Sequence, residues 1–113
     1  MIKIDYSKQI GKKVVISEKL QDSYVNMEDI THITCDKYVI TTHLVNGQKV
    51  QSTVHLLKHF ENELREYGFL RANNKTVVNI KHLSTFQIVD GKKYIRVHNI
   101  DIPVTKRKSW LAV

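Results

Sequence analysis

The chain has 113 residues, of which 42% are hydrophobic, and a formal net charge of +7; this composition fits one folded domain and excludes a disordered chain. No apolar run approaches the roughly 20 residues that cross a bilayer, and the N-terminus lacks the apolar core of a signal peptide. With a single cysteine, Cys35, these features predict a cytoplasmic protein that does not enter a membrane.

The positive charge is unevenly distributed along the chain. Residues 1–68 contain nine Lys or Arg and nine Asp or Glu, whereas residues 69–113 contain nine basic residues and only Asp90 and Asp101 as acids. The whole excess of +7 therefore lies in the last 45 residues. Such a concentration is what a binding surface for a polyanion requires, although unevenly placed surface lysines would give the same count.

Short β-branched runs in the first half of the chain predict strands at 13–16, 24–25, 30–33 and 38–44. Asn46-Gly47 predicts a two-residue type I′ hairpin turn, because both residues tolerate positive φ, and 49–53 is the expected return strand. Residues 1–11 precede this pattern, and we interpret them as an N-terminal extension or an extra strand before a domain at 12–113.

The hydrophobic spacing then changes to that of a helix, which we expect to end near Tyr67 with Gly68 just beyond it. Ser52 or Thr53 is the expected N-cap. The predicted buried face consists of Leu56, Leu57, Phe60 and Leu64, and the predicted outer face carries Glu61, Glu63 and Glu66.

Strands are predicted again at 77–80, 84–89, 94–97 and 100–104, with a hairpin turn at Asp90-Gly91 and a short helical turn at 105–111. Phe69 and Phe86 lie in apolar patterns and are expected in the core. Because hairpins join antiparallel strands, the predicted fold class is all-β, with antiparallel sheets and one principal α-helix.

Residues that often carry catalysis or bind metal give weak signals in this chain. His55 and His59 are four residues apart on the predicted helix, but two histidines do not complete a metal site, and we interpret both as solvated. Cys35 is expected to be a partly buried structural residue. Since the sequence has no Gly-rich phosphate loop, nucleophile elbow or convincing carboxylate pair, we expect neither an enzyme nor a cofactor.

The polar segment from Arg71 to Lys75, which we expect to form a loop, carries the strongest functional signal. Arginine forks onto phosphate or guanine, asparagine pairs bidentately with adenine, and lysine offers a point charge to the DNA backbone. An ordinary polar turn is the alternative interpretation, because Asn73-Asn74 is turn-prone.

Two blocks of the sequence, at 69–80 and 102–108, resemble the signature of the LytTR family of bacterial DNA-binding domains. That family typically reads Phe-x-Arg-x-His-Arg-Ser, two hydrophobic positions and Val-Asn, and later an apolar residue followed by Pro-Val-Ser-Arg. Here Asn73, Asn74 and Lys75 replace the family's His, Arg and Ser, and Thr105-Lys106, followed by Arg107, replaces Ser-Arg. The resemblance extends in spacing over roughly residues 30–111.

The resemblance implies an elongated set of antiparallel sheets that binds double-stranded DNA sequence-specifically through loops and regulates transcription, as in response regulators. It implies base or phosphate contacts from Lys37, Tyr38, Arg71, Asn73, Asn74, Lys75, Lys106, Arg107 and Lys108, with further phosphate contacts from Lys92 and Lys93. Asn79 falls on the family's Val-Asn position, where we expect it to hold backbone groups at a strand-loop junction.

Partners other than DNA follow from the same resemblance. Family members often bind paired repeats, which implies a homodimer. Because 113 residues leave no room for an attached receiver domain, we expect any controlling signal to come from a separate signalling protein or from oligomerisation. Two alternatives are a basic module that binds acidic proteins or membrane surfaces, and a sheet that binds single-stranded RNA.

Overall fold

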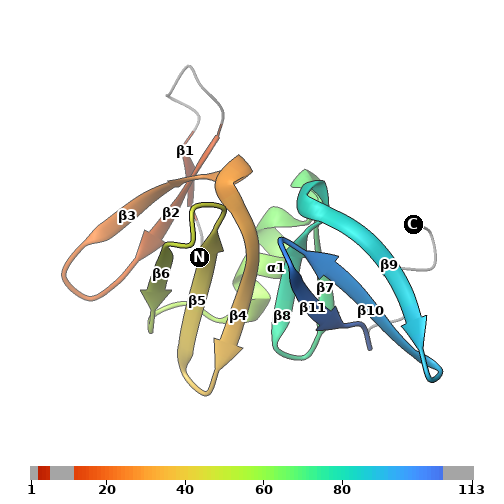
Figure 1. Cartoon of the computed structure of the whole chain (residues 1–113). Coiled ribbons are helices and arrows are strands. Elements are labelled where there is room, and N and C mark those ends of the chain that lie inside the picture. The colour runs from red at the N-terminus through yellow and green to blue at the C-terminus, as the bar shows by residue number, and fades with distance from the viewer. Residues whose placement is uncertain (1–2, 6–11, 106–113) are drawn as a thin grey trace.

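The structure is a computed structural model of the chain, and residues 3–5 and 12–105 of it are described here. Within these residues, eleven strands, one α-helix and three short 3-10 helices form three antiparallel sheets that span 45 × 32 × 25 Å (Figure 1). The elements are β1 (Lys3–Asp5), β2 (Lys13–Ser17), β3 (Asp22–Asn26), η1 (Met27–Asp29), β4 (Ile30–Asp36), β5 (Val39–Leu44), β6 (Lys49–Ser52), α1 (Leu57–Leu64), η2 (Arg65–Tyr67), β7 (Phe69–Asn73), β8 (Thr76–Asn79), η3 (Ile80–His82), β9 (Leu83–Val89), β10 (Lys92–Val97) and β11 (Ile100–Pro103). The predicted fold class, antiparallel sheets with one principal helix, is confirmed.

The five-stranded sheet, in the order β6-β5-β4-β8-β7, is the centre of the molecule. In the view of Figure 1, the sheet β1-β2-β3 lies to the left of the central sheet, and the sheet β11-β10-β9 lies to its right. The key pairing joins β4 to β8, with Ile33 opposite Val77. This pairing brings the first hairpin of the central sheet beside a hairpin that follows the helix in sequence.

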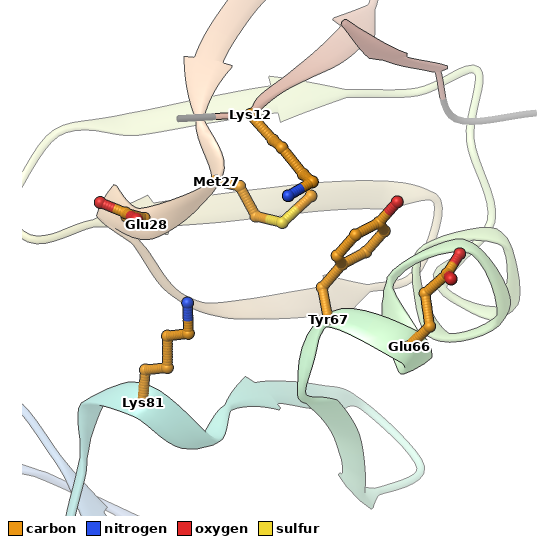
Figure 2. A pocket seen from close by; sticks show the side chains of 6 residues that line it. All are labelled: Lys12, Met27, Glu28, Glu66, Tyr67 and Lys81. Atoms are coloured by element: carbon orange, nitrogen blue, oxygen red, sulfur yellow. The ribbon is translucent and has the colours of Figure 1, made fainter. Parts of the chain in front are cut away.

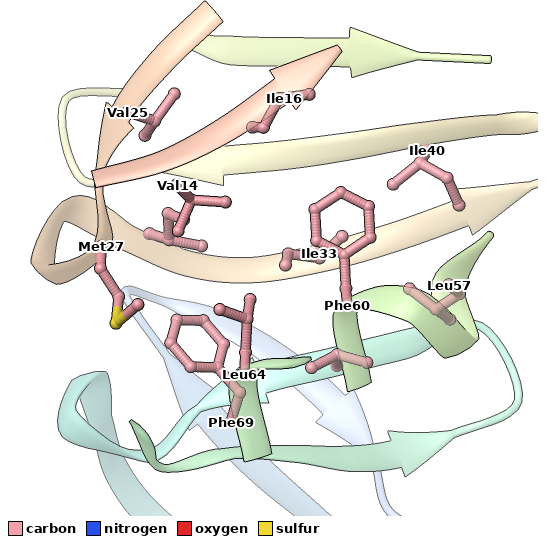
Figure 3. Close-up of a cluster of buried hydrophobic side chains, with 12 residues drawn as sticks. Val14, Ile16, Val25, Met27, Ile33, Ile40, Leu57, Phe60, Leu64 and Phe69 are labelled. Carbon is pink, nitrogen blue, oxygen red and sulfur yellow. The ribbon is translucent and has the colours of Figure 1, made fainter. Parts of the chain in front are cut away.

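Two hydrophobic clusters hold these sheets together, and the hairpin of β7 and β8 contributes to both. The larger cluster places α1 residues such as Phe60 and Leu64 against β2, β4 and β5, and includes Phe69 and Val77 (Figure 3). The smaller cluster places Val78 of β8 against β10 and β11. The hairpin of β7 and β8, which we call the signature hairpin, is therefore held in place from two sides.

The helix is shorter than predicted. Leu56 is extended, is 62% exposed and precedes the helix, so its predicted place on the buried face is wrong. Ser52 is not the N-cap either, because it ends β6 and donates a hydrogen bond to Ser17 O at 2.6 Å. Instead His59 Nδ1 accepts the Leu56 N–H at 3.3 Å. Gly68 follows the last turn with φ of 91°, as predicted for a residue just past the helix.

Other predictions on single residues need correction. His55 is buried, not solvated, and its Nε2 accepts the Ser17 N–H at 3.0 Å. Burial lowers the pKa of His55, since the charged imidazolium would lose solvent. Phe69 is buried as expected, but Phe86 on β9 is 43% exposed, because β9 is an edge strand that extends past the core. Cys35 is partly buried, as predicted.

The hairpin turns agree only in part with the sequence. Asp90-Gly91 forms a two-residue turn with positive φ at both residues, as expected. The β5–β6 connection has four residues, 45–48, with positive φ only at Gly47, so it is not the predicted type I′ turn. A second two-residue turn with positive φ, His98-Asn99, joins β10 to β11 and was not predicted.

Candidate nucleic-acid interface

The signature segment forms a hairpin rather than the loop that the sequence predicted. Arg71 to Asn73 belong to β7, and the turn contains only Asn74 and Lys75. Both turn residues are exposed. The polar side chains were read as a loop, but pairing with the fully buried strand β8 keeps β7 extended up to Asn73.

Arg71 stabilises this turn from within. Its Nε donates to Asn73 O at 2.9 Å and its Nη2 to Asn74 O at 3.1 Å, while Nη1 contacts Glu61 Oε1 at 2.8 Å. The Arg71 and Glu61 side chains are only 18% and 21% exposed. Arg71 therefore positions the turn and ties it to α1, and Glu61 faces Arg71 instead of lying on an open outer face.

Asn73 connects the signature hairpin to the end of β11. Its Nδ2 donates to Pro103 O at 2.8 Å, and its Oδ1 accepts the Lys75 N–H at 2.8 Å. Just beyond, Thr105 N–H donates to Ala72 O at 2.8 Å. Because both ends of the Asn73 amide are engaged inside the protein, this side chain positions the turn and has little capacity left for a base edge.

The C-terminal basic block therefore begins beside the signature hairpin. Lys106, Arg107 and Lys108, and most of the predicted helical turn at 105–111, lie outside the described residues. Thr105, which precedes them directly, is fixed by its hydrogen bond to β7. Residues 102–105, the described start of the second sequence block, thus contact the first block, although residues 81–101 separate the two blocks in the chain.

The turn at Lys37 and Tyr38 lies next to the signature turn. Cys35 N–H donates to Lys75 O at 2.9 Å, which continues the β4–β8 pairing to the end of both hairpins. Tyr38 is 86% exposed, and Lys37, with φ of 57°, is exposed as well. The structure thus brings together the two turns that the resemblance had proposed separately.

The β9–β10 turn extends the same side of the molecule. Figure 1 shows the β4–β5, β7–β8 and β9–β10 turns all pointing downward. Directly after the last of these turns, β10 begins with Lys92, which is exposed, and Lys93, which is half-buried. We call the edge formed by the three turns at 37–38, 74–75 and 90–91 the turn edge.

Not every basic residue of the C-terminal half contributes free charge. Arg96 forms an ion pair with Asp101 at 2.9 Å, and this guanidinium lowers the pKa of the Asp101 carboxyl through a hydrogen bond.

Asn79 is buried, donates to Ile30 O at 2.9 Å and accepts the Lys81 N–H at 3.1 Å. It holds backbone groups at the end of β8, which confirms its predicted structural role.

A hollow of about 300 Å³ lies at the opposite end of β8 (Figure 2). Its lining carries ammonium groups and carboxylates in equal number and consists of Lys12, Met27, Glu28, Glu66, Tyr67 and Lys81. This mixture of charges does not favour a polyanion. Among the described residues, no group of three His, Cys, Asp or Glu side chains is arranged to hold a metal ion.

Comparisons with known proteins give the family and the fold. The family model of the LytTr DNA-binding domain matches residues 21–110. Among solved structures, the chain is similar to the LytTr DNA-binding domain of a response regulator from Bacillus cereus, with a TM-score of 0.68 at 15% identity. That match covers 82% of this chain and 85% of the other, and at this identity it shows a shared fold. A comparison with curated proteins gives no match. In the described part of the chain, no helix has the length and apolar character needed to span a bilayer.

Proposed function

We propose that this chain, which belongs to the LytTR family of DNA-binding domains, binds double-stranded DNA sequence-specifically and regulates transcription in the bacterial cytoplasm. The observation that carries the proposal is the turn edge. Two exposed turns are joined there by the hydrogen bond from Cys35 to Lys75, and the C-terminal basic block starts beside them at Thr105. Three separate chain segments thereby offer polar and basic side chains to one ligand.

The contacts of each side chain support a division of roles. Asn74 and Lys75 lie at the tip of the turn, so we assign base contacts to them, aided by Lys106 and Arg107. We assign phosphate contacts to Lys37, Lys92, Lys93 and Lys108, and a packing or hydrogen-bonding contact to Tyr38. Arg71 and Asn73 act through the turn that they hold.

The helix is not the recognition element in this proposal. Leu57, Phe60 and Leu64 bury its apolar face in the core. Glu63 on the remaining surface of α1, and Glu66 in η2 directly after it, would repel phosphate. DNA reading through turns is therefore favoured over a helix inserted into the major groove.

A competition assay with single variants tests the assignment of readers. Asn74→Ala should weaken the binding free energy for a selected site by about 1–3 kcal/mol and reduce the base preference at one or two positions, because an amide discriminates base edges. Lys108→Ala should weaken all duplexes alike and reduce the slope of log affinity against log salt by about one. Asn62→Ala, at an exposed position of α1, is the matched control and should change neither.

The same assay separates the alternatives. Equal losses on the site and on scrambled duplexes for Asn74→Ala would show that the turn does not read bases. Preference for single-stranded RNA over every duplex would favour the RNA-binding alternative instead. We further propose that the protein binds paired repeats as a homodimer and is controlled by a separate signalling protein. Sedimentation with paired and single sites tests the dimer, and we expect one protomer per repeat.

A further inference from the structure

Four histidines gather where the five-stranded sheet meets the C-terminal sheet. The rings of His32 on β4 and His43 on β5 are stacked, with centroids 4.1 Å apart and planes 3° from parallel. His82 of η3 and His98 of the β10–β11 turn lie beside them, with His82 Nδ1 3.0 Å from His98 Nε2. The mechanism proposed for DNA binding uses none of these residues.

The hydrogen bonds define which nitrogens carry protons in the neutral rings. A carbonyl oxygen only accepts, so His82 Nε2 donates to Glu28 O, 2.6 Å away, and His82 Nδ1 accepts from His98 Nε2. Thr31 Oγ1 donates its proton to His43 O at 3.2 Å, so Thr31 Oγ1 accepts from His32 Nδ1 at 2.8 Å. His32 Nε2 is therefore left as an unprotonated acceptor.

Three of these histidines line a cleft of about 320 Å³. The cleft has one lysine and no carboxylate side chain in its lining, which consists of Thr31, His32, His43, Leu44, Val45, Gly47, Gln48, Lys49, His98, Asn99 and Ile100. Burial, followed by charge repulsion from His43, His98 and Lys49, lowers the pKa of His32 to about 4. Burial and Lys49 also lower the pKa of His43. An anion in the cleft would relieve these repulsions.

We propose that this cleft binds the phosphate group of a small molecule. Lys49 and the ring N–H groups of His43 and His98 would face the phosphate oxygens that carry charge. The neutral His32 Nε2 would accept the proton of a hydrogen phosphate, whose second pKa is about 6. Sulfate carries no proton near neutral pH, so it cannot make that last hydrogen bond.

A transition metal suits the cleft less well. The lone pairs of the His32 and His43 rings lie in two nearly parallel planes, so the two rings cannot direct them at one tetrahedral ion as they stand. Lys49 would repel a cation, and no carboxylate offsets the charge. The proposal therefore commits to an anion.

The cleft and the turn edge lie at opposite ends of the same strands. The cleft is bounded by the β5–β6 and β10–β11 connections, whereas the turn edge contains the β4–β5 and β9–β10 turns (Figure 1). Both sheets contribute walls to the cleft and turns to the edge. A bound phosphate would thus fix the angle between the five-stranded sheet and the C-terminal sheet, whose turns form the turn edge. This effect on DNA binding rests on the proposed function, whereas phosphate binding itself does not.

The test is a titration of the whole chain with inorganic phosphate, followed by the NMR signals of the histidine rings. We expect saturable shifts of the His43 and His98 ring signals, because the ring N–H groups of both residues would donate to the phosphate oxygens. Lys49→Gln should lower the phosphate affinity about fivefold, as expected for one partly exposed charge pair. His98→Asn, which tolerates the positive φ of 46°, should lower it similarly.

The controls separate the sources of a phosphate group. Lys58→Gln removes one charge from an exposed position of α1 and should leave the affinity unchanged. Saturating duplex should leave the phosphate-induced shifts in place, and sulfate should bind more weakly than phosphate. No saturable shift, an equal loss in Lys58→Gln, displacement of phosphate by duplex, or equal binding of sulfate would each overturn the proposal.

Discussion

Replacing Asn73 by alanine separates the residues that position the signature turn from those that read DNA. The change removes two hydrogen bonds, to Pro103 O and from Lys75 N, each at 2.8 Å. A typical intramolecular hydrogen bond contributes about 0.5–1.5 kcal/mol net, so the summed loss is roughly 1–3 kcal/mol. Because both partners lie near solvent, we expect the lower half of that range in the free energy of unfolding.

Urea denaturation of Asn73→Ala and Asn74→Ala measures this difference directly. Among the described residues, Asn74 has no side-chain hydrogen bond, and its replacement should change stability by less than about 0.5 kcal/mol. The two variants should also differ in DNA binding. Asn74→Ala should change base preference, whereas Asn73→Ala should lower the affinity for all duplexes, because it would displace the C-terminal basic block. Equal stability of Asn73→Ala and the unmodified chain would refute the positioning role.

Three further predictions follow from burial and charge. Replacing Leu64, which is 0% exposed, by alanine should lower the free energy of unfolding by about 2–5 kcal/mol, whereas Leu56→Ala should lower it far less. Similar urea midpoints for the two variants would contradict the packing. His32 has a lowered pKa in the folded state, so its stabilising contribution is complete above pH 6.5 and is lost as the pH falls towards about 4. That loss should approach about 3 kcal/mol, and His32→Gln should flatten the pH dependence of stability measured by urea titration. For DNA, neutralising Lys92 and Lys93 should reduce the salt slope of affinity by about two; an unchanged slope would exclude them as phosphate contacts.

Local sequence patterns predicted most of the strands for a simple physical reason. Runs such as Ile30–Asp36 are rich in β-branched residues, and Asp90-Gly91 accepts the positive φ of a tight hairpin. The pattern failed where tertiary contacts decide. The predicted N-cap, Ser52 or Thr53, lies three or four residues before the observed N-cap, Leu56. The end of β7 was predicted as a loop because its side chains are polar, whereas its pairing with β8 keeps it extended.

The residue types of the candidate site were evident from the sequence, but their arrangement was not. The Lys37 turn meets the Lys75 turn only through the non-local pairing of β4 with β8. The contact of Arg71 with Glu61 likewise depends on how α1 packs on the sheet. The histidine cluster draws its members from four separate elements, and no spacing in the sequence marks it.

Selection from a library of random duplexes tests the central claim most directly. The unmodified chain should enrich one defined motif, and Asn74→Ala, selected in parallel, should lose preference at one or two positions of that motif while keeping the rest. Asn62→Ala should return the unmodified motif. Recovery of no motif by the unmodified chain would contradict sequence-specific binding, and an unaltered motif with Asn74→Ala would contradict the turn edge as its reader.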